Sequence, residues 1–254
     1  MLIDTHAHLY ANDFADDRDE MIRNAIQAGV QKIVLPNIDE NSIDSMLELG
    51  SAYPGVCFPL IGLHPSSVGE NYKEQLETVE TWLGKRDFFG IGETGIDLYW
   101  DKTYQKEQEE AFRIQLKMAR SLHKPVVIHV RNSFNEVYQI LKEEQDGNLF
   151  GVFHCFSGSV AEALNIIEIG FSMGIGGVVT FKNSNLPETL RQVDIKHIVL
   201  ETDAPYLAPM PQRGRRNESA FLLQIAEKVS DIYGIDIAEV SIKTSANAEM
   251  LFGI

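Results

Sequence analysis

The chain has 254 residues, of which 44% are hydrophobic and 23% charged, and its formal net charge is −15. This length fits one large domain, no apolar run could span a bilayer, and the amino terminus lacks the features of a secretory signal. The acidity excludes binding of nucleic acid through a broad basic face, because that needs clustered lysines and arginines. We expect a soluble, cytoplasmic protein that needs neither a membrane nor an obligate protein partner.

Strand-like apolar runs alternate with segments of helical spacing. The first such segment, 17–29, places Met21, Ile22 and Ala25 on one face and Gly29 where a helix would stop. Eight strand-helix units predict a single (β/α)8 TIM barrel over residues 1–254 rather than an open sheet. A final helical stretch, 236–253, is expected to pack on the outside. The runs are LIDTH (2–6), KIVLPN (32–37), VCFPLIGLH (56–64), FFGIGE (88–93), PVVIHV (125–130), LFGVFHCF (149–156), FSMGIGG (171–177) and HIVLETD (197–203).

The two cysteines, Cys57 and Cys155, each lie inside one of these apolar runs. A pair in this setting is more typical of small buried side chains than of a disulfide framework. We expect both thiols to be free.

Ionisable side chains end most of the predicted strands. Because the carboxyl ends of barrel strands meet at one rim, residues far apart in sequence are expected to gather there. Five of the seven histidines fall at this rim, which scattered core histidines would not do. The strand-end residues are His6, His8, His64, Glu93, His129, His154, Glu201 and Asp203.

Four imidazoles and two carboxylates of this set predict a site for two divalent cations with Glu93 as the candidate bridge. The ligand types suit Mn²⁺ or Zn²⁺, whereas Mg²⁺ prefers oxygen and water, so the residues leave the metal open. Such a pair activates water for hydrolysis, with Asp203 as general base and Glu201 orienting it from behind. The predicted ligands are His6, His8, Glu93, His129, His154 and Asp203.

Several motifs resemble the signatures of the TatD family of metal-dependent deoxyribonucleases, which belong to the amidohydrolase-like barrels. The resemblance runs from about Asp4 to Phe252 and departs from the family pattern at Ser219, where proline usually follows RNE. Glu93 ends the fourth strand in place of a lysine that could be carbamylated, which disfavours one rival group of the superfamily. The motifs are IDTHAHL, GLHP, GETGIDLYW, PVVIHVR, HCFSGS and ETDAPYLAP, followed by RGRRNE.

The resemblance implies a Mg²⁺- or Mn²⁺-dependent 3′→5′ exonuclease that acts mainly on single-stranded DNA, with RNA as an alternative substrate. One metal would be held by His6, His8, Glu93 and Asp203, and the other by Glu93, His129 and His154. Asp203, Glu93 and His64 form the catalytic set, with His64 near the substrate phosphate. Arg131 is a candidate phosphate contact or a surface salt bridge. Tyr99 and Trp100 are candidates for base stacking or for capping the core.

Two other functions stay open. The first is a metal-dependent hydrolase of a small molecule, such as a cyclic amide, a lactone, an aminoacyl ester or a phosphate ester, because this fold does not fix the substrate. The second is a non-catalytic metal-binding scaffold, which is disfavoured because no predicted ligand is missing. An exonuclease needs an open groove with local cations, and Arg131, Arg213, Arg215 and Arg216 favour the groove.

Overall fold

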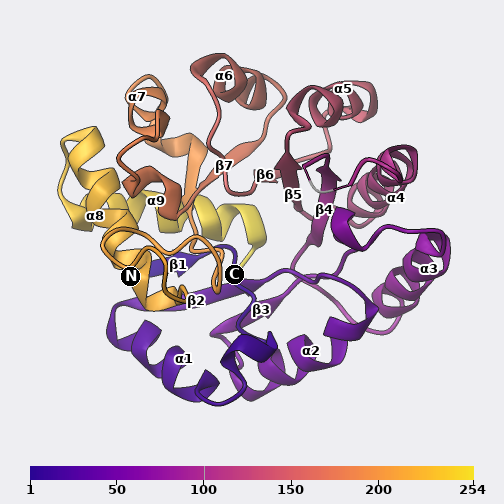
Figure 1. The fold of residues 1–254 in the computed structure, drawn as a ribbon, viewed down its shortest axis with the longest axis horizontal. Helices are drawn as coiled ribbons and strands as arrows, with labels where there is room; N and C mark the ends of the chain where they lie inside the picture. Colours follow the sequence, from indigo (N-terminus) through magenta and orange to yellow (C-terminus); the bar gives the residue numbers. More distant parts are fainter. Residues whose placement is uncertain (100) are drawn as a thin grey trace.

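In the part of the chain that the structure describes, eight parallel strands form the centre of the protein (Figure 1). The structure is a computed structural model that describes residues 1–99 and 101–254. The strands pair in sequence order within two sheets, β1-β2-β3 and β4-β5-β6-β7-β8. They are β1 (Leu2–Asp4), β2 (Val30–Leu35), β3 (Cys57–Pro59), β4 (Ile91–Asp97), β5 (Val126–Arg131), β6 (Gly151–Phe153), β7 (Ser172–Ile175) and β8 (Ile198–Leu200).

Backbone contacts beyond the named strands join the two sheets on both sides. Just after β1, the Thr5 amide donates to the Leu200 carbonyl at 3.0 Å, and Ala7 forms a parallel bridge with Ala204. After β3, Ile61 bridges Ile91 in the same way. The strands therefore form a ring, and the predicted TIM-barrel fold is confirmed.

Helices surround this ring, as Figure 1 shows. In α1, Met21, Ile22 and Ala25 are buried as the apolar spacing predicts, and Gly29 follows with a φ of 94°. No helix in the described part of the chain combines the length and apolar character needed to cross a membrane. The helices are α1 (Arg18–Gln27), α2 (Ile43–Ala52), α3 (Tyr72–Leu83), α4 (Gln105–Leu122), α5 (Phe134–Glu144), α6 (Val160–Glu168), α7 (Leu186–Leu190), α8 (Leu222–Tyr233) and α9 (Ile237–Phe252).

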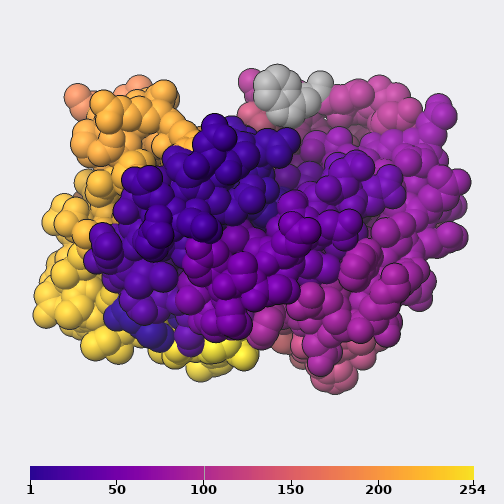
Figure 2. All heavy atoms as spheres, turned by 90° about the horizontal axis from the view of Figure 1, so that it is seen from below, coloured from indigo at the N-terminus to yellow at the C-terminus, as the bar shows by residue number. Residues whose placement is uncertain are grey.

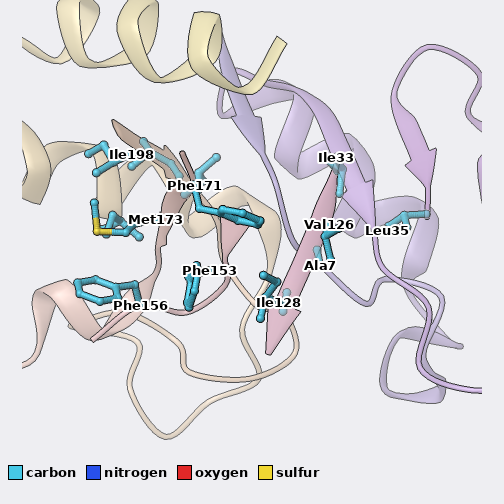
Figure 3. Close-up of a cluster of buried hydrophobic side chains, with 14 of the residues drawn as sticks. Ala7, Ile33, Leu35, Val126, Ile128, Phe153, Phe156, Phe171, Met173 and Ile198 are labelled. Atoms are coloured by element: carbon cyan, nitrogen blue, oxygen red, sulfur yellow. The ribbon is translucent and has the colours of Figure 1, made fainter. Parts of the chain in front are cut away.

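The strand side chains form two apolar layers. Val127 of β5 points into the barrel, while its neighbours Val126 and Ile128 belong to the larger cluster between strands and helices, part of which is drawn in Figure 3. The inner layer consists of Ile3, Val34, Phe58, Leu60, Val127, Val152 and Val199. Strands that are apolar on both faces are what a buried parallel sheet requires.

Helix α9 closes one end of the barrel instead of lying on its flank. Its Ala248 and Phe252 are buried in the same cluster as the inner strand residues. In Figure 1 this helix, in pale yellow, passes behind the strands. The helix thus packs on the outside of the barrel, as expected, but across its end, where it shields the inner apolar layer from water.

Candidate metal centre

The Glu93 carboxylate of β4 lies at the centre of the predicted site and is buried. Its Oε2 lies 3.1 Å from His6 Nε2 and 3.7 Å from His8 Nε2. Its Oε1 lies 2.7 Å from His129 Nδ1 and 3.4 Å from His64 Nε2. The two oxygens thus face two different groups of imidazoles, so Glu93 could contribute a ligand atom to each group.

The chain segments that follow β1 and β8 bring the first group of ligands together. The Asp203 amide donates to the His6 carbonyl at 2.9 Å, and the His8 amide donates to the Ala204 carbonyl at 2.7 Å. This pairing places Asp203 Oδ1 3.8 Å from His6 Nε2 and 3.9 Å from His8 Nε2. On its other side, His8 Nδ1 lies 2.9 Å from the Tyr10 hydroxyl, which orients the ring.

His154 links the ligand groups, and Glu201 supports it. The His154 ring stacks on the His6 ring with 3.5 Å between centroids, and its Nε2 lies 3.8 Å from Asp203 Oδ1. Its Nδ1 lies 2.9 Å from Glu201 Oε1, which also accepts from the Cys155 amide. The Glu201 side chain therefore lies against His154 and the Cys155 amide, and its expected role behind Asp203 stays a prediction.

On the Oε1 side of Glu93, Asp97 and His64 both contact His129. Asp97 Oδ2 lies 3.0 Å from His129 Nε2 and can fix the orientation of that ring. Asp97 was not among the residues predicted from the sequence. It follows Glu93 by four positions, and side chains four positions apart in a strand point to the same side of the sheet. His64 Nε2 lies 3.2 Å from His129 Nδ1, which places His64 among the candidate ligands as well as near the substrate.

Burial and mutual charge set the protonation of the site. Burial would raise the pKa of Glu93, but the facing imidazoles outweigh it and hold that pKa well below its usual value. Burial raises the pKa of Asp203 to about 7. Burial would lower the pKa of His154, but Glu201, Glu93 and Asp203 raise it to about 10. A buried group of carboxylates of this kind requires positive charge close by.

The donor atoms suit divalent cations. Among the described residues, four groups of side chains each offer ligand atoms within 4.8 Å of one another: His6, His8 and Asp203; His6, Glu93 and His154; His64, Glu93 and His129; and His154, Cys155 and Glu201. Imidazole nitrogen mixed with carboxylate oxygen is a common ligand set for Zn²⁺ and Mn²⁺. The residues therefore fit the metals that the sequence predicts, and His64 is an additional ligand candidate.

A cleft of about 740 Å³ opens above these residues. It is lined by His8, His64, Glu93, His129, His154 and Asp203 among others, so all of the predicted ligands except His6 line it. Cys155 also lines it and is half-buried, whereas Cys57 is buried, and both thiols are free as expected.

The predicted substrate contacts are only partly at this cleft. Arg131 lines it, with its guanidinium carbon 4.1 Å from the centre of the Tyr99 ring. Trp100 lies outside the described residues. Arg216 pairs with Asp17 through both of its terminal nitrogens, and Arg213 lies over the Phe181 ring. Arg213, Arg215 and Arg216 are exposed and are not among the described residues that line the cleft, so their part in a substrate groove stays a prediction.

The segment after β8 is held by residues of the RNE motif, which the sequence analysis did not assign. Asn217 is fully buried, and its Nδ2 donates to the carbonyls of Thr202 at 2.7 Å and Tyr206 at 2.6 Å. Ser219, which stands in place of the usual proline, is buried and begins a short 3₁₀ helix (Ser219–Phe221) directly before α8. The departure from the family pattern therefore does not prevent the following helix.

Gly174 of β7 makes room for Glu201. A Cβ atom on Gly174 would lie only 2.2 Å from Glu201 Oε2, so we expect Gly174→Ala to displace Glu201 and release His154. This overpacking should cost about 1–3 kcal/mol of stability and weaken metal binding. The measurement is thermal unfolding with and without Mn²⁺.

Gly84→Ala is the control, because its Cβ would meet no atom closer than 3.5 Å. Equal metal stabilisation in both variants would contradict this role of Glu201.

The chain is similar to known proteins over its whole length. The family model described as TatD related DNase matches residues 3–253. The chain is 34% identical to a Bacillus subtilis protein named uncharacterized metal-dependent hydrolase YabD. It is 30% identical to an Erwinia amylovora protein named 3′-5′ ssDNA/RNA exonuclease TatD. Both alignments cover 100% of this chain and 100% of the relative. The crystal structure of YjjV, a TatD homologue from Escherichia coli, matches with a TM-score of 0.94 at 26% identity, covering 100% of this chain and 98% of that one. The chain therefore belongs to the TatD related DNase family and is a metal-dependent hydrolase.

Proposed function

We propose that this protein is a 3′→5′ exonuclease that hydrolyses phosphodiester bonds of single-stranded DNA, with RNA as a second substrate. The observation that carries the proposal is the Glu93 carboxylate, whose two oxygens face separate groups of imidazoles at the floor of an open cleft. The name of the Erwinia amylovora relative supports the direction and the substrate.

The proposed cofactor is a pair of divalent cations, Mg²⁺ or Mn²⁺ for activity and Zn²⁺ as an alternative. His6, His8, Glu93 and Asp203 would hold one, and Glu93, His129 and His154 the other, with His64 adjacent to the second group. When bound, such a pair lowers the pKa of water and stabilises the attacking and leaving oxygens of a phosphoryl displacement.

Asp203 is the proposed general base. Its carboxylate lies between the two groups, 3.8 Å from both His6 Nε2 and His154 Nε2, and it lines the cleft. From there it can take a proton from the attacking water while Glu201 holds His154 in place. His64 lies near Glu93 Oε1 and Arg131 lines the same cleft, and both are proposed contacts of the substrate phosphate.

One observation favours a second candidate, a hydrolase of a small phosphate or carboxylate ester. A volume of about 740 Å³ is within the range of pockets that enclose a single small ligand. Under this alternative the same residues would act on a different bond.

The test is hydrolysis of a single-stranded oligonucleotide labelled at its 5′ end, with Mg²⁺, with Mn²⁺ and with a chelator. A metal-dependent ladder that shortens from the 3′ end supports the exonuclease. Bound metal without any cleavage of DNA or RNA would reject the exonuclease and favour the small-molecule hydrolase.

We expect DNA affinity to depend only weakly on salt. Arg131 is the only lysine or arginine among the described residues that line the cleft. One or two neutralised phosphates give a slope of log affinity against log salt of about −0.7 to −1.4 for single strands. Fluorescence anisotropy at several salt concentrations measures it, and Arg131→Gln should flatten the slope by about 0.7. A steep slope would reveal an extended basic groove.

A further inference from the structure

Tyr206 places an aromatic ring beside the metal centre. It lines the cleft, yet 53% of its surface is exposed. Its ring lies 6.2 Å from the His8 ring, centroid to centroid, at an interplanar angle of 66°. The ring therefore stands next to a candidate metal ligand with much of its surface available for contact.

The segment that carries Tyr206 is anchored on several sides. The Tyr206 amide donates to the Asp203 carbonyl at 2.7 Å, and its carbonyl accepts from the buried Asn217. Further along, the Met210 amide donates to the Thr180 hydroxyl at 2.8 Å. Figure 2 shows the segment after β8, in orange, raised at the edge of the molecule with the surface lower beside it. The backbone that carries the ring is thus held in place beside the candidate metal ligands.

Beyond the proposed metal centre, the cleft offers few fixed charges that could hold the rest of an anionic strand. The chain carries a net charge of −15, and Arg131 is the only lysine or arginine among the described residues that line the cleft. A second hollow of about 420 Å³ shares the His154 and Cys155 wall, but Glu136 and Glu162 line it. Those carboxylates disfavour a phosphate chain there, so contact on the Tyr206 side of the centre is favoured.

We propose that the Tyr206 ring is the stacking surface for the base of the 3′-terminal nucleotide, and that it thereby selects strands with an unpaired end. This inference rests on the proposed function and adds to it a residue that contacts the substrate base. Stacking suits an enzyme that accepts any sequence, because every base has an aromatic face. The phenol group is not required for this contact, so phenylalanine should replace tyrosine without loss.

The test compares two short single-stranded oligonucleotides that differ only in whether the 3′-terminal residue carries a base. Binding is measured by fluorescence anisotropy with Mn²⁺ in the Asp203→Asn background, so that the strands are not cut. We expect removal of the base to weaken binding about 5- to 150-fold. Adding Tyr206→Ala should weaken binding of the ordinary strand by a similar factor and abolish the difference between the two strands.

Two variants control for the shape of the loop and for the hydroxyl group. Tyr206→Phe should keep the full preference for the strand with a terminal base. Met210→Ala trims a 37% exposed apolar side chain of the same segment that is not among the described residues lining the cleft, and it should also keep this preference. An unchanged preference in Tyr206→Ala, an equal loss in Tyr206→Phe, or no preference in the starting protein would each overturn the proposal. Failure of the exonuclease assignment is read separately, from whether the wild-type protein shortens DNA.

Discussion

Asp203→Asn is expected to lower hydrolysis of single-stranded DNA by about 10²- to 10⁴-fold, the usual contribution of a general base. Asparagine is nearly the same size as aspartate and keeps one oxygen near His6 and His154, but it cannot accept the proton from the attacking water. The fold and most of the metal affinity should remain. Initial rates with Mn²⁺, together with metal content by mass spectrometry, separate these effects.

Asp194→Asn is the matched control for this experiment. Asp194 caps the short 3₁₀ helix before β8, is not among the residues lining the cleft, and its side chain accepts from the Lys196 amide. Asparagine serves equally well as an amino-terminal cap, so activity and stability should stay near the wild-type values. Turnover close to wild type in Asp203→Asn would remove Asp203 from the role of base.

Glu93→Gln is expected to reduce metal binding at both groups of ligands at once. The Glu93 oxygens lie 3.1 Å from His6 Nε2 and 2.7 Å from His129 Nδ1, so one carboxylate supplies negative charge to both sides. Changing residues that only support metal ligands costs about 10- to 100-fold, so loss of a shared ligand should lower affinity at least 100-fold. Titration calorimetry with Mn²⁺ measures both the affinity and the number of ions bound.

Glu80→Gln, an exposed position on α3, makes the same chemical change away from the site and should leave binding unaltered. Circular dichroism of both variants establishes that they are folded. If Glu93→Gln still bound two ions with wild-type affinity, Glu93 could not be the bridge. If it lost only one ion, the carboxylate would belong to a single site.

The positions of the candidate ligands follow from the sequence to a large extent. Alternating apolar runs and helical segments predict the barrel, and the barrel brings the carboxyl ends of its strands to one rim. His6, Glu93 and Asp203 each end a predicted strand, so their meeting needed no knowledge of loop conformation. The assignment of each ligand to one metal or the other stays a prediction.

The contacts around the ligands could not be predicted in this way. Sequence spacing says that Glu201 lies at the rim, but not that it reaches His154. Likewise, three arginines close together in sequence indicated a binding surface, but not that Arg216 pairs with Asp17. The direction of a long side chain depends on neighbours from distant segments, which residue type and periodicity do not specify.

The sequence by itself thus determined the fold class, the rim at which the candidate ligands gather and the residue types that can bind metal, because hydrophobic periodicity and strand direction are local properties. Only the tertiary structure decided that the Glu93 oxygens face two groups, that α9 closes the barrel and that Tyr206 stands beside His8. Those arrangements arise from packing between segments that lie far apart in the sequence. Such packing depends on the shape of the whole molecule, which local patterns do not specify.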